Sequence, residues 1–346
     1  MKDHLAHLCL IQARLCNRLG SPMYAGLLDD VAADVRSGGP AWSVLQDLAG
    51  CPEGAYPALR LLGSVHRLVL EGRVPVLARH YPSVGGTPDG ALWEDLRAVL
   101  AEHTDELREL VQRPPQTNEV GRSAALLGGY TTVAARTGLP LRLLEIGTSA
   151  GLNLVWDAHH YRSGSWSWGD PQAPVRIDEV FDGPAPALTD AQVAERAGCD
   201  LDPVDVTTED GRLTLLSFVW PDQDVRRARL AAAIEVFRAA TPRPRIERAD
   251  ALTWLADRLG EDGAGVATVV THSVVTTYFD EGTRAELDDL LAHHGARATA
   301  AAPLARLSLE ADAAGLFEVR LRTWPGGEER LLSTVGGHGL PVRWAA

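Results

Sequence analysis

The sequence has almost no lysine, little cysteine and no long apolar run. Lys2 is its only lysine, so nearly all of the positive charge is arginine, which we attribute to codon usage. The formal net charge is −13, which argues against a sequence-independent nucleic-acid binder, because phosphate binding requires a basic face. No apolar stretch is long enough to span a membrane. We therefore expect a small-molecule substrate and no nucleic-acid or membrane partner, while the oligomeric state stays open.

The scarcity of cysteine excludes a further class of site. No two cysteines have the C-x-x-C or zinc-ligand spacing, so we expect no metal and interpret the cysteines as buried, small apolar residues. Gln12 and Arg14 interrupt the N-terminal apolar pattern, which argues against a signal peptide. Together these features predict a reduced cytoplasmic protein. The four cysteines are Cys9, Cys16, Cys51 and Cys199.

What the sequence does contain is a strand, a glycine turn and a helix in immediate succession. Leu141–Ile146 is a short apolar run with one acid, as in a buried parallel strand. Gly147 and Gly151 bracket a tight turn, and the apolar residues that follow have helical spacing. Such a turn directs the first N–H groups of a helix at the carboxyl edge of the sheet, where open α/β sheets bind ligands.

Three interpretations of this turn are open. Glu145, Gly147, Ser149 and Gly151 resemble the acid-x-Gly-x-small-x-Gly loop of class I S-adenosylmethionine (SAM) methyltransferases. The segment from Gly147 to Gly151 also fits G-x-S-x-G, the nucleophile elbow of serine hydrolases, with Ser149 as the nucleophile. The third interpretation is a tight turn without a ligand, because short glycine patterns recur often.

The position of the turn in the chain favours the methyltransferase interpretation. No strand pattern precedes residue 141, whereas a hydrolase elbow normally follows several strands that also supply the oxyanion hole. A hydrolase with His272 or His338 as the base therefore remains the alternative. Helical periodicity and capping signals predict helices before the turn over about 5–19, 22–38, 58–70, 92–111 and 117–136.

The remaining two thirds alternate strands and helices. We expect strands over 175–181, 245–250, 265–273 and 296–302, where Asp250 ends the second, then a hairpin of 317–324 with 329–335. Residues 189–237 look mainly helical and are too many for a simple connection, so we place a helical insertion at about 185–240. The expected fold is α/β: a class I methyltransferase-like (Rossmann-like), seven-stranded, mostly parallel sheet. It spans residues 117–346, after a helical N-terminal region over 1–116.

Acidic residues near the strand ends are the next candidates for cofactor binding. Methyltransferases of this class place an acid at the end of strand two for the ribose hydroxyls, and Asp178 has this position. Glu179, Asp182 and Asp200 are alternatives, and each also fits a solvated turn. Asp250 follows the next strand, where an acid accepts a hydrogen bond from the adenine amine; it also fits a helix N-cap.

Two polar groups are candidates for the site of the methyl acceptor. His272 and Tyr278 follow the fourth strand, and a histidine there could act as a general base or be a hydrogen-bonded structural residue. Asn118, Glu119 and Arg122 fall near one face of the helix that precedes strand one. They would line the pocket, or Asn118 and Glu119 would face water at a capped helix start.

At full length the chain resembles a bacterial family filed as domain of unknown function 2332. That resemblance implies a methyltransferase-like fold but no activity. From the residues of the turn and of the strand ends we expect a SAM-dependent methyltransferase acting on a small molecule, with Asn153 also near the cofactor. The alternatives are a non-catalytic SAM-fold protein that binds a ligand or partner, and the serine hydrolase. The stretches that carry the resemblance are residues 78–83, 116–122, 145–153, 168–171, 198–201, 219–223 and 324–327.

Overall fold

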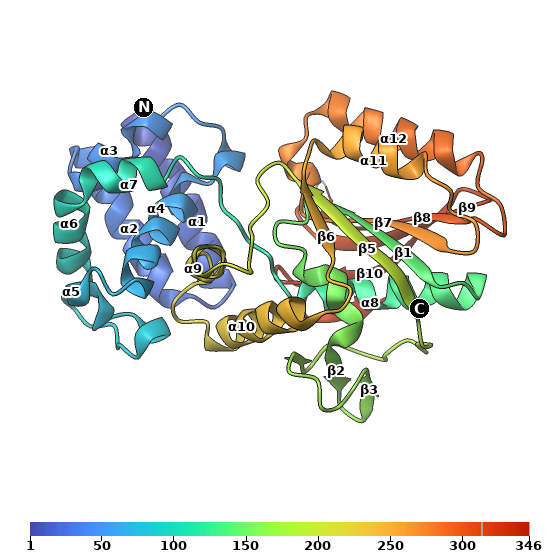
Figure 1. Cartoon of the computed structure of the whole chain (residues 1–346). Coiled ribbons are helices and arrows are strands. Elements are labelled where there is room, and N and C mark those ends of the chain that lie inside the picture. Colours follow the sequence, from blue (N-terminus) through green and yellow to red (C-terminus); the bar gives the residue numbers. More distant parts are fainter. Residues whose placement is uncertain (313, 346) are drawn as a thin grey trace. The chain divides into compact units, whose positions relative to one another are not determined.

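The computed structural model describes residues 1–312 and 314–345 and divides into two compact units (Figure 1). The helical unit comprises Met1–Thr117 and Thr207–Ala228, and the α/β unit comprises Asn118–Val206 and Arg229–Ala346. Residues 207–228 thus lie inside the predicted insertion but belong to the helical unit. In the described part of the chain, no helix combines the length and the apolar character that crossing a membrane requires.

Amphipathic helices around an apolar core form the helical unit. In α4 (Pro57–Leu70), Leu61, Leu62, Val65 and Leu68 are fully buried and recur at helical spacing. The expected helix over 92–111 is divided at His103, which precedes the start of the second piece. The other helices are α1 (Lys2–Arg18), α2 (Pro22–Ser37), α3 (Pro40–Leu45), α5 (Pro75–Ala78), α6 (Leu92–Glu102), α7 (Thr104–Leu110) and α9 (Glu209–Ser217), with the 3-10 turns η1 (Gln46–Leu48), η2 (Glu53–Ala55) and η3 (Pro82–Val84).

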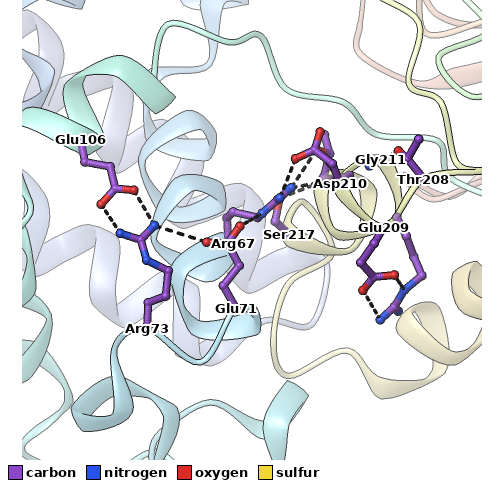
Figure 2. Close-up of polar contacts among 11 residues, drawn as sticks. Arg67, Glu71, Arg73, Glu106, Thr208, Glu209, Asp210, Gly211 and Ser217 are labelled. Atoms are coloured by element: carbon purple, nitrogen blue, oxygen red, sulfur yellow. Dashed lines mark hydrogen bonds and ion pairs between the residues drawn. The ribbon is translucent and has the colours of Figure 1, made fainter.

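Arg67 of α4 holds α9 in the helical unit, as Figure 2 shows. Its guanidinium donates to the Asp210 carboxylate at 2.7 Å and to the Thr214 hydroxyl at 3.0 Å. Glu71, the residue that follows α4, lies 2.5 Å from the Arg67 Nε and is a further acceptor. The Arg67 side chain is 14% exposed and the Asp210 side chain is 72% exposed, so only the arginine end of this ion pair is shielded from water.

An eight-stranded sheet forms the α/β unit, in the order β11-β10-β9-β8-β7-β1-β5-β6. The five strands from β8 to β6 run parallel, and β9, β10 and β11 continue the sheet in antiparallel pairs. The strands are β1 (Leu141–Ile146), β5 (Val193–Asp200), β6 (Arg245–Arg248), β7 (Ala267–Ser273), β8 (Leu304–Ala311), β9 (Phe317–Trp324), β10 (Glu328–Val335) and β11 (Val342–Trp344).

Helices cover both faces of this sheet. Figure 1 shows α11 (Ala251–Leu259) and α12 (Glu281–Gly295) over one face and α8 (Arg122–Thr137) against the other. Every residue of β1 is buried, as expected for a central parallel strand. The 3-10 helix η4 (Leu152–Ala158) follows β1, η5 (Thr276–Tyr278) follows β7, and α10 (Asp224–Ala239) begins in the helical unit and ends in the α/β unit.

The predicted sheet was partly wrong. A mixed α/β fold and the hairpin of β9 with β10 are confirmed, but the sheet has eight strands instead of seven. The predicted strand over 175–181 is reduced to β4 (Arg176–Ile177), which joins a separate small sheet with β2 (His160–Ser163) and β3 (Trp166–Trp168). Its place beside β1 belongs to β5, inside the segment predicted to be helical. The fifth parallel strand lies at Leu304–Ala311 and not at 296–302.

The role of Arg67 can be tested against a surface arginine of the same network. Arg67→Ala should lower the free energy of unfolding by about 2 kcal/mol, because it removes the hydrogen bonds to Asp210, Glu71 and Thr214 together. Arg73→Ala is the control: its side chain is 44% exposed and pairs with Glu106, so it should cost about 0.5 kcal/mol. Urea unfolding of both variants measures the difference. Equal losses of the free energy of unfolding would contradict the role of Arg67 in holding α9.

Candidate functional site

The strand order places a candidate site beside the carboxyl end of β1. From β1 the chain adds β5 and β6 on one side, whereas β7 and β8 lie on the other. Where the order of parallel strands reverses, the connections leave in opposite directions and a crevice opens outside the carboxyl ends. The segments at this edge are the turn from Gly147 to Gly151, Asp200 at the end of β5, Asp250 after β6, and Ser273 at the end of β7 with the residues that follow it.

The turn after β1 has a strained backbone. The Gly151 N–H donates to the Thr148 carbonyl at 2.9 Å, and Ser149, the first of the two central residues, has a φ of 54°. A positive φ at the first central residue alone is the arrangement of a type II′ turn. At the end of the neighbouring β7, Val274 has a φ of 55°, which is rare for a β-branched residue. Strained residues tend to cluster at functional sites, and these two follow adjacent strands.

Several N–H groups in and beside the turn are bonded within the protein. Thr148 donates to the Cys199 carbonyl at 3.0 Å, and Ser149 donates to the Asp200 carboxylate at 2.8 Å. The N–H of Leu152, at the start of η4, donates to the Asn118 side chain at 3.0 Å. These groups are therefore not directed at a bound anion, so the turn is unlike the phosphate cradles of nucleotide-binding loops.

Packing within the chain explains both glycines of the turn. A β-carbon on Gly147 would lie 2.3 Å from the Val275 side chain, and one on Gly151 would lie 2.4 Å from Ile246. Both glycines also have a positive φ. The glycine spacing that resembles a cofactor loop is thus also explained by packing against neighbouring side chains.

Glu145 is a buried acid beneath the turn. It is 3% exposed, and its carboxylate accepts a hydrogen bond from the Thr148 hydroxyl at 2.5 Å. Burial raises the pKa of Glu145 to about 7, although the Thr148 hydrogen bond and the Arg122 cation act in the opposite direction. The carboxyl group therefore titrates near neutral pH, which is frequent among residues of functional sites.

Asp200, and not Asp178, stands at the end of the strand beside β1. Its two carboxylate oxygens accept from the Ser149 N–H at 2.8 Å and from the Asp202 N–H at 2.9 Å. Asp178 follows β4 of the small sheet, where it forms an ion pair with Arg162 at 2.8 Å and is half exposed. Glu179 also follows β4, whereas Asp182 forms an ion pair at 2.7 Å with Arg343 of β11. Of the acids considered for the ribose, Asp200 is the one at the carboxyl edge of the large sheet.

Asp250 lies at that edge as a helix cap. Its carboxylate accepts hydrogen bonds at 3.0 Å from both the N–H and the hydroxyl of Thr253, at the start of α11. This is the N-cap geometry that the sequence suggested as the alternative. A carboxylate has about four acceptor positions, so a cap can also accept from a ligand.

His272 is held by two charged neighbours. Its Nδ1 lies 2.7 Å from the Glu310 carboxylate, and its Nε2 lies 3.0 Å from the Arg306 Nε. The ring is fully buried. Of the two interpretations of His272, general base and hydrogen-bonded structural residue, this environment fits the second. Tyr278, by contrast, is 54% exposed in η5. Glu310 was missed, although an acid near the end of the apolar strand β8 is a visible signal.

Asn118, Glu119 and Arg122 do not share one helical face, because α8 begins only at Arg122. The Glu119 carboxylate accepts from the Gly121 N–H at 3.0 Å and lies 3.9 Å from the His338 Nδ1. Arg122 donates to the Ser273 carbonyl at 3.1 Å. Asn153 donates to the Glu119 carbonyl at 3.4 Å. The segment before α8 is therefore bonded to η4 and lies near the loop after β10, whereas Arg122 of α8 is bonded to the end of β7.

Glu145→Gln should remove a pH-dependent loss of stability. The folded chain keeps the Glu145 proton up to about pH 7, whereas the ordinary pKa is 4.5. The folded state therefore binds more protons between these values, and the free energy of unfolding falls as the pH rises through this window. The loss from this group should be on the order of 3 kcal/mol.

Urea unfolding at pH 5 and at pH 8 measures this loss. The decrease between the two pH values should be smaller in Glu145→Gln than in the wild type. An equal decrease in both proteins would mean that the pKa of Glu145 is not raised.

Comparison with known proteins places the chain in a family but indicates no activity. No curated protein and no solved structure matches it. One family model, described as "Uncharacterized protein conserved in bacteria (DUF2332)", matches residues 6–344. The match includes both the helical and the α/β unit, and the chain therefore belongs to this bacterial family of uncharacterized proteins.

Proposed function

We propose that the protein is a SAM-dependent methyltransferase that acts on a small molecule. The observation that carries the proposal is the set of acids at the carboxyl edge of three adjacent parallel strands. Glu145 is the last residue but one of β1, Asp200 ends β5 and Asp250 follows β6, and the strand order reverses next to the first of them. Rossmann-like methyltransferases bind the cofactor along such an edge, so the finer fold assignment is part of the same proposal.

The chemistry of these residues fits SAM better than a dinucleotide. A dinucleotide carries a pyrophosphate that needs free N–H groups, whereas the N–H groups of Thr148, Ser149 and Leu152 already have acceptors. SAM has no phosphate. Its ribose hydroxyls would donate to remaining acceptor positions of Asp200, and its adenine amine would donate to Asp250.

SAM would supply an electrophilic methyl group on a sulfonium. The chain has to align the acceptor with that methyl group and exclude water. His272 would act as a positioning residue in this arrangement, because both ring nitrogens are engaged by Glu310 and Arg306. Because both nitrogens of His272 are already bonded, a second candidate function is that of a protein of this fold that binds the ligand without catalysis. Turnover of SAM with a methyl acceptor separates the two functions.

S-adenosylhomocysteine should bind and stabilise the protein. A hundredfold excess over the dissociation constant should add about 2.7 kcal/mol of stability. Asp200→Asn should weaken binding about tenfold or more, because it removes hydrogen bonds to a charged group. Asp178→Asn is the matched control and should bind as the wild type does, since Asp178 lies in the small sheet.

Isothermal calorimetry measures these affinities, and thermal melting confirms that each variant is folded. Absence of binding heat with the wild type would overturn the proposal. Equal weakening in Asp200→Asn and Asp178→Asn would overturn the placement of the ribose.

A second reaction to test is hydrolysis with Ser149 as the nucleophile, because this serine combines the G-x-S-x-G pattern with a positive φ. We expect it to be a residue of the cofactor turn instead. Ser149→Ala should therefore keep S-adenosylhomocysteine affinity within about a factor of ten, the range for one hydrogen bond. Mass mapping after treatment with a fluorophosphonate should find no adduct on Ser149. An adduct at that residue would make the hydrolase the leading function.

A further inference from the structure

A serine and a histidine of the helical unit form a pair that the proposed methyltransferase does not use. The Ser83 hydroxyl, in η3, lies 2.8 Å from the Nε2 of His66 on α4. The other ring nitrogen, Nδ1, lies 3.1 Å from the main-chain carbonyl of Ser217, at the end of α9. A nucleophile within hydrogen-bond reach of a base, with the base oriented by a third group, is the usual signature of nucleophilic catalysis.

The neighbours of His66 determine which nitrogen carries the proton. A carbonyl oxygen can only accept, so Nδ1 must carry the hydrogen that it donates to Ser217. Burial lowers the pKa of His66 to about 4, so the ring is neutral and Nε2 keeps its lone pair. The Ser83 hydroxyl therefore donates to Nε2 and directs its own lone pairs away from the ring. This is the state in which a serine can transfer its proton as it attacks.

The surroundings fix this geometry from both sides. His66 is fully buried, and the Tyr81 ring packs against it at a centroid distance of 5.5 Å. Ser217 belongs to α9, which Arg67, the residue after His66, holds through the bonds drawn in Figure 2. Ser83 itself is only partly buried, in contrast to His66.

We propose that Ser83 is a nucleophile that takes an acyl group from an activated donor, an aryl ester or a thioester, with His66 as its base. The Ser83 Oγ forms a bond to the acyl carbon as the bond to the aryloxide or thiolate breaks. The hydroxyl proton passes to His66 Nε2 and leaves with the departing aryloxide or thiolate, so that His66 is neutral again. Water subsequently attacks the acyl-serine ester, which restores the hydroxyl and releases the carboxylic acid.

The structure also limits the donor to one with a good leaving group. The N–H groups of Val84, Gly85, Gly86 and Thr87 donate to carbonyls of this same segment, so they are not arranged as an oxyanion hole. A fully buried imidazole is a weak base, because burial disfavours its charged form. Donors whose leaving group needs protonation, such as alkyl esters and amides, are therefore excluded.

The test uses the full chain with p-nitrophenyl acetate and a fluorophosphonate. Mass mapping should find the adduct on Ser83, with one equivalent of label per chain. Ser83→Ala should abolish it, and His66→Gln should slow labelling about 100-fold or more, the effect of losing a general base. Ser43→Ala is the matched control: this serine donates to the Gly39 carbonyl, and its loss should leave the rate unchanged.

Two results would overturn the proposal. One is a folded wild type without an adduct on Ser83, which needs no variant to be interpreted. The other is an equal labelling rate in wild type and folded His66→Gln. A purely structural hydroxyl would give the first result. Because Ser83→Ala should bind S-adenosylhomocysteine as the wild type does, failure here is distinct from failure of the methyltransferase proposal.

Discussion

The hydrogen bond from the Ser149 N–H to the Asp200 carboxylate is the contact on which the candidate site depends. It joins the turn after β1 to the end of β5, and the second oxygen of Asp200 holds the N–H of Asp202. A hydrogen bond from a main-chain N–H to a charged acceptor is stronger than one to a neutral acceptor. Its energy helps to offset the cost of the positive φ at Ser149, which is on the order of 1–3 kcal/mol.

The turn is further supported from beneath and from the side. The Thr148 hydroxyl donates to the buried Glu145, and Asn118 accepts from the Leu152 N–H at the start of η4. Val275 and Ile246 fill the space that side chains on Gly147 and Gly151 would need. The turn is thus rigid in the absence of any ligand. A rigid loop suits a site that binds by preorganisation, since little conformational entropy is lost on binding.

The sequence predicted the parts of the fold that depend on local composition. β1 and its glycine turn are confirmed because an apolar run bounded by glycines leaves few alternatives. β5 was missed because its first half is exposed and charged, with Glu195 paired to Arg142 across to β1. The apolar run over 175–181 was mistaken for a strand of the large sheet, because its pattern does not tell which partner it pairs with.

The candidate site shows the same limit of prediction. The acids at the strand ends could be predicted, but Asp200 could not be chosen over Asp178 before the strand order was known. The environment of His272 depends on Glu310, 38 residues away. The assignment of α9 to the helical unit depends on Arg67, which lies 143 residues before Asp210. Such distant pairs leave no periodic pattern in the sequence.

The discontinuous course of the helical unit has a consequence for how the protein is made. His66 and Ser217 are separated by 151 positions, so a ribosome adding about 5–20 residues per second completes this contact many seconds after α4 emerges. Until then, the surface of α4 that α9 covers stays exposed to water. Residues 118–206 of the α/β unit are made before residues 207–228 complete the helical unit, so the helical unit cannot finish folding until part of the α/β unit has been synthesised.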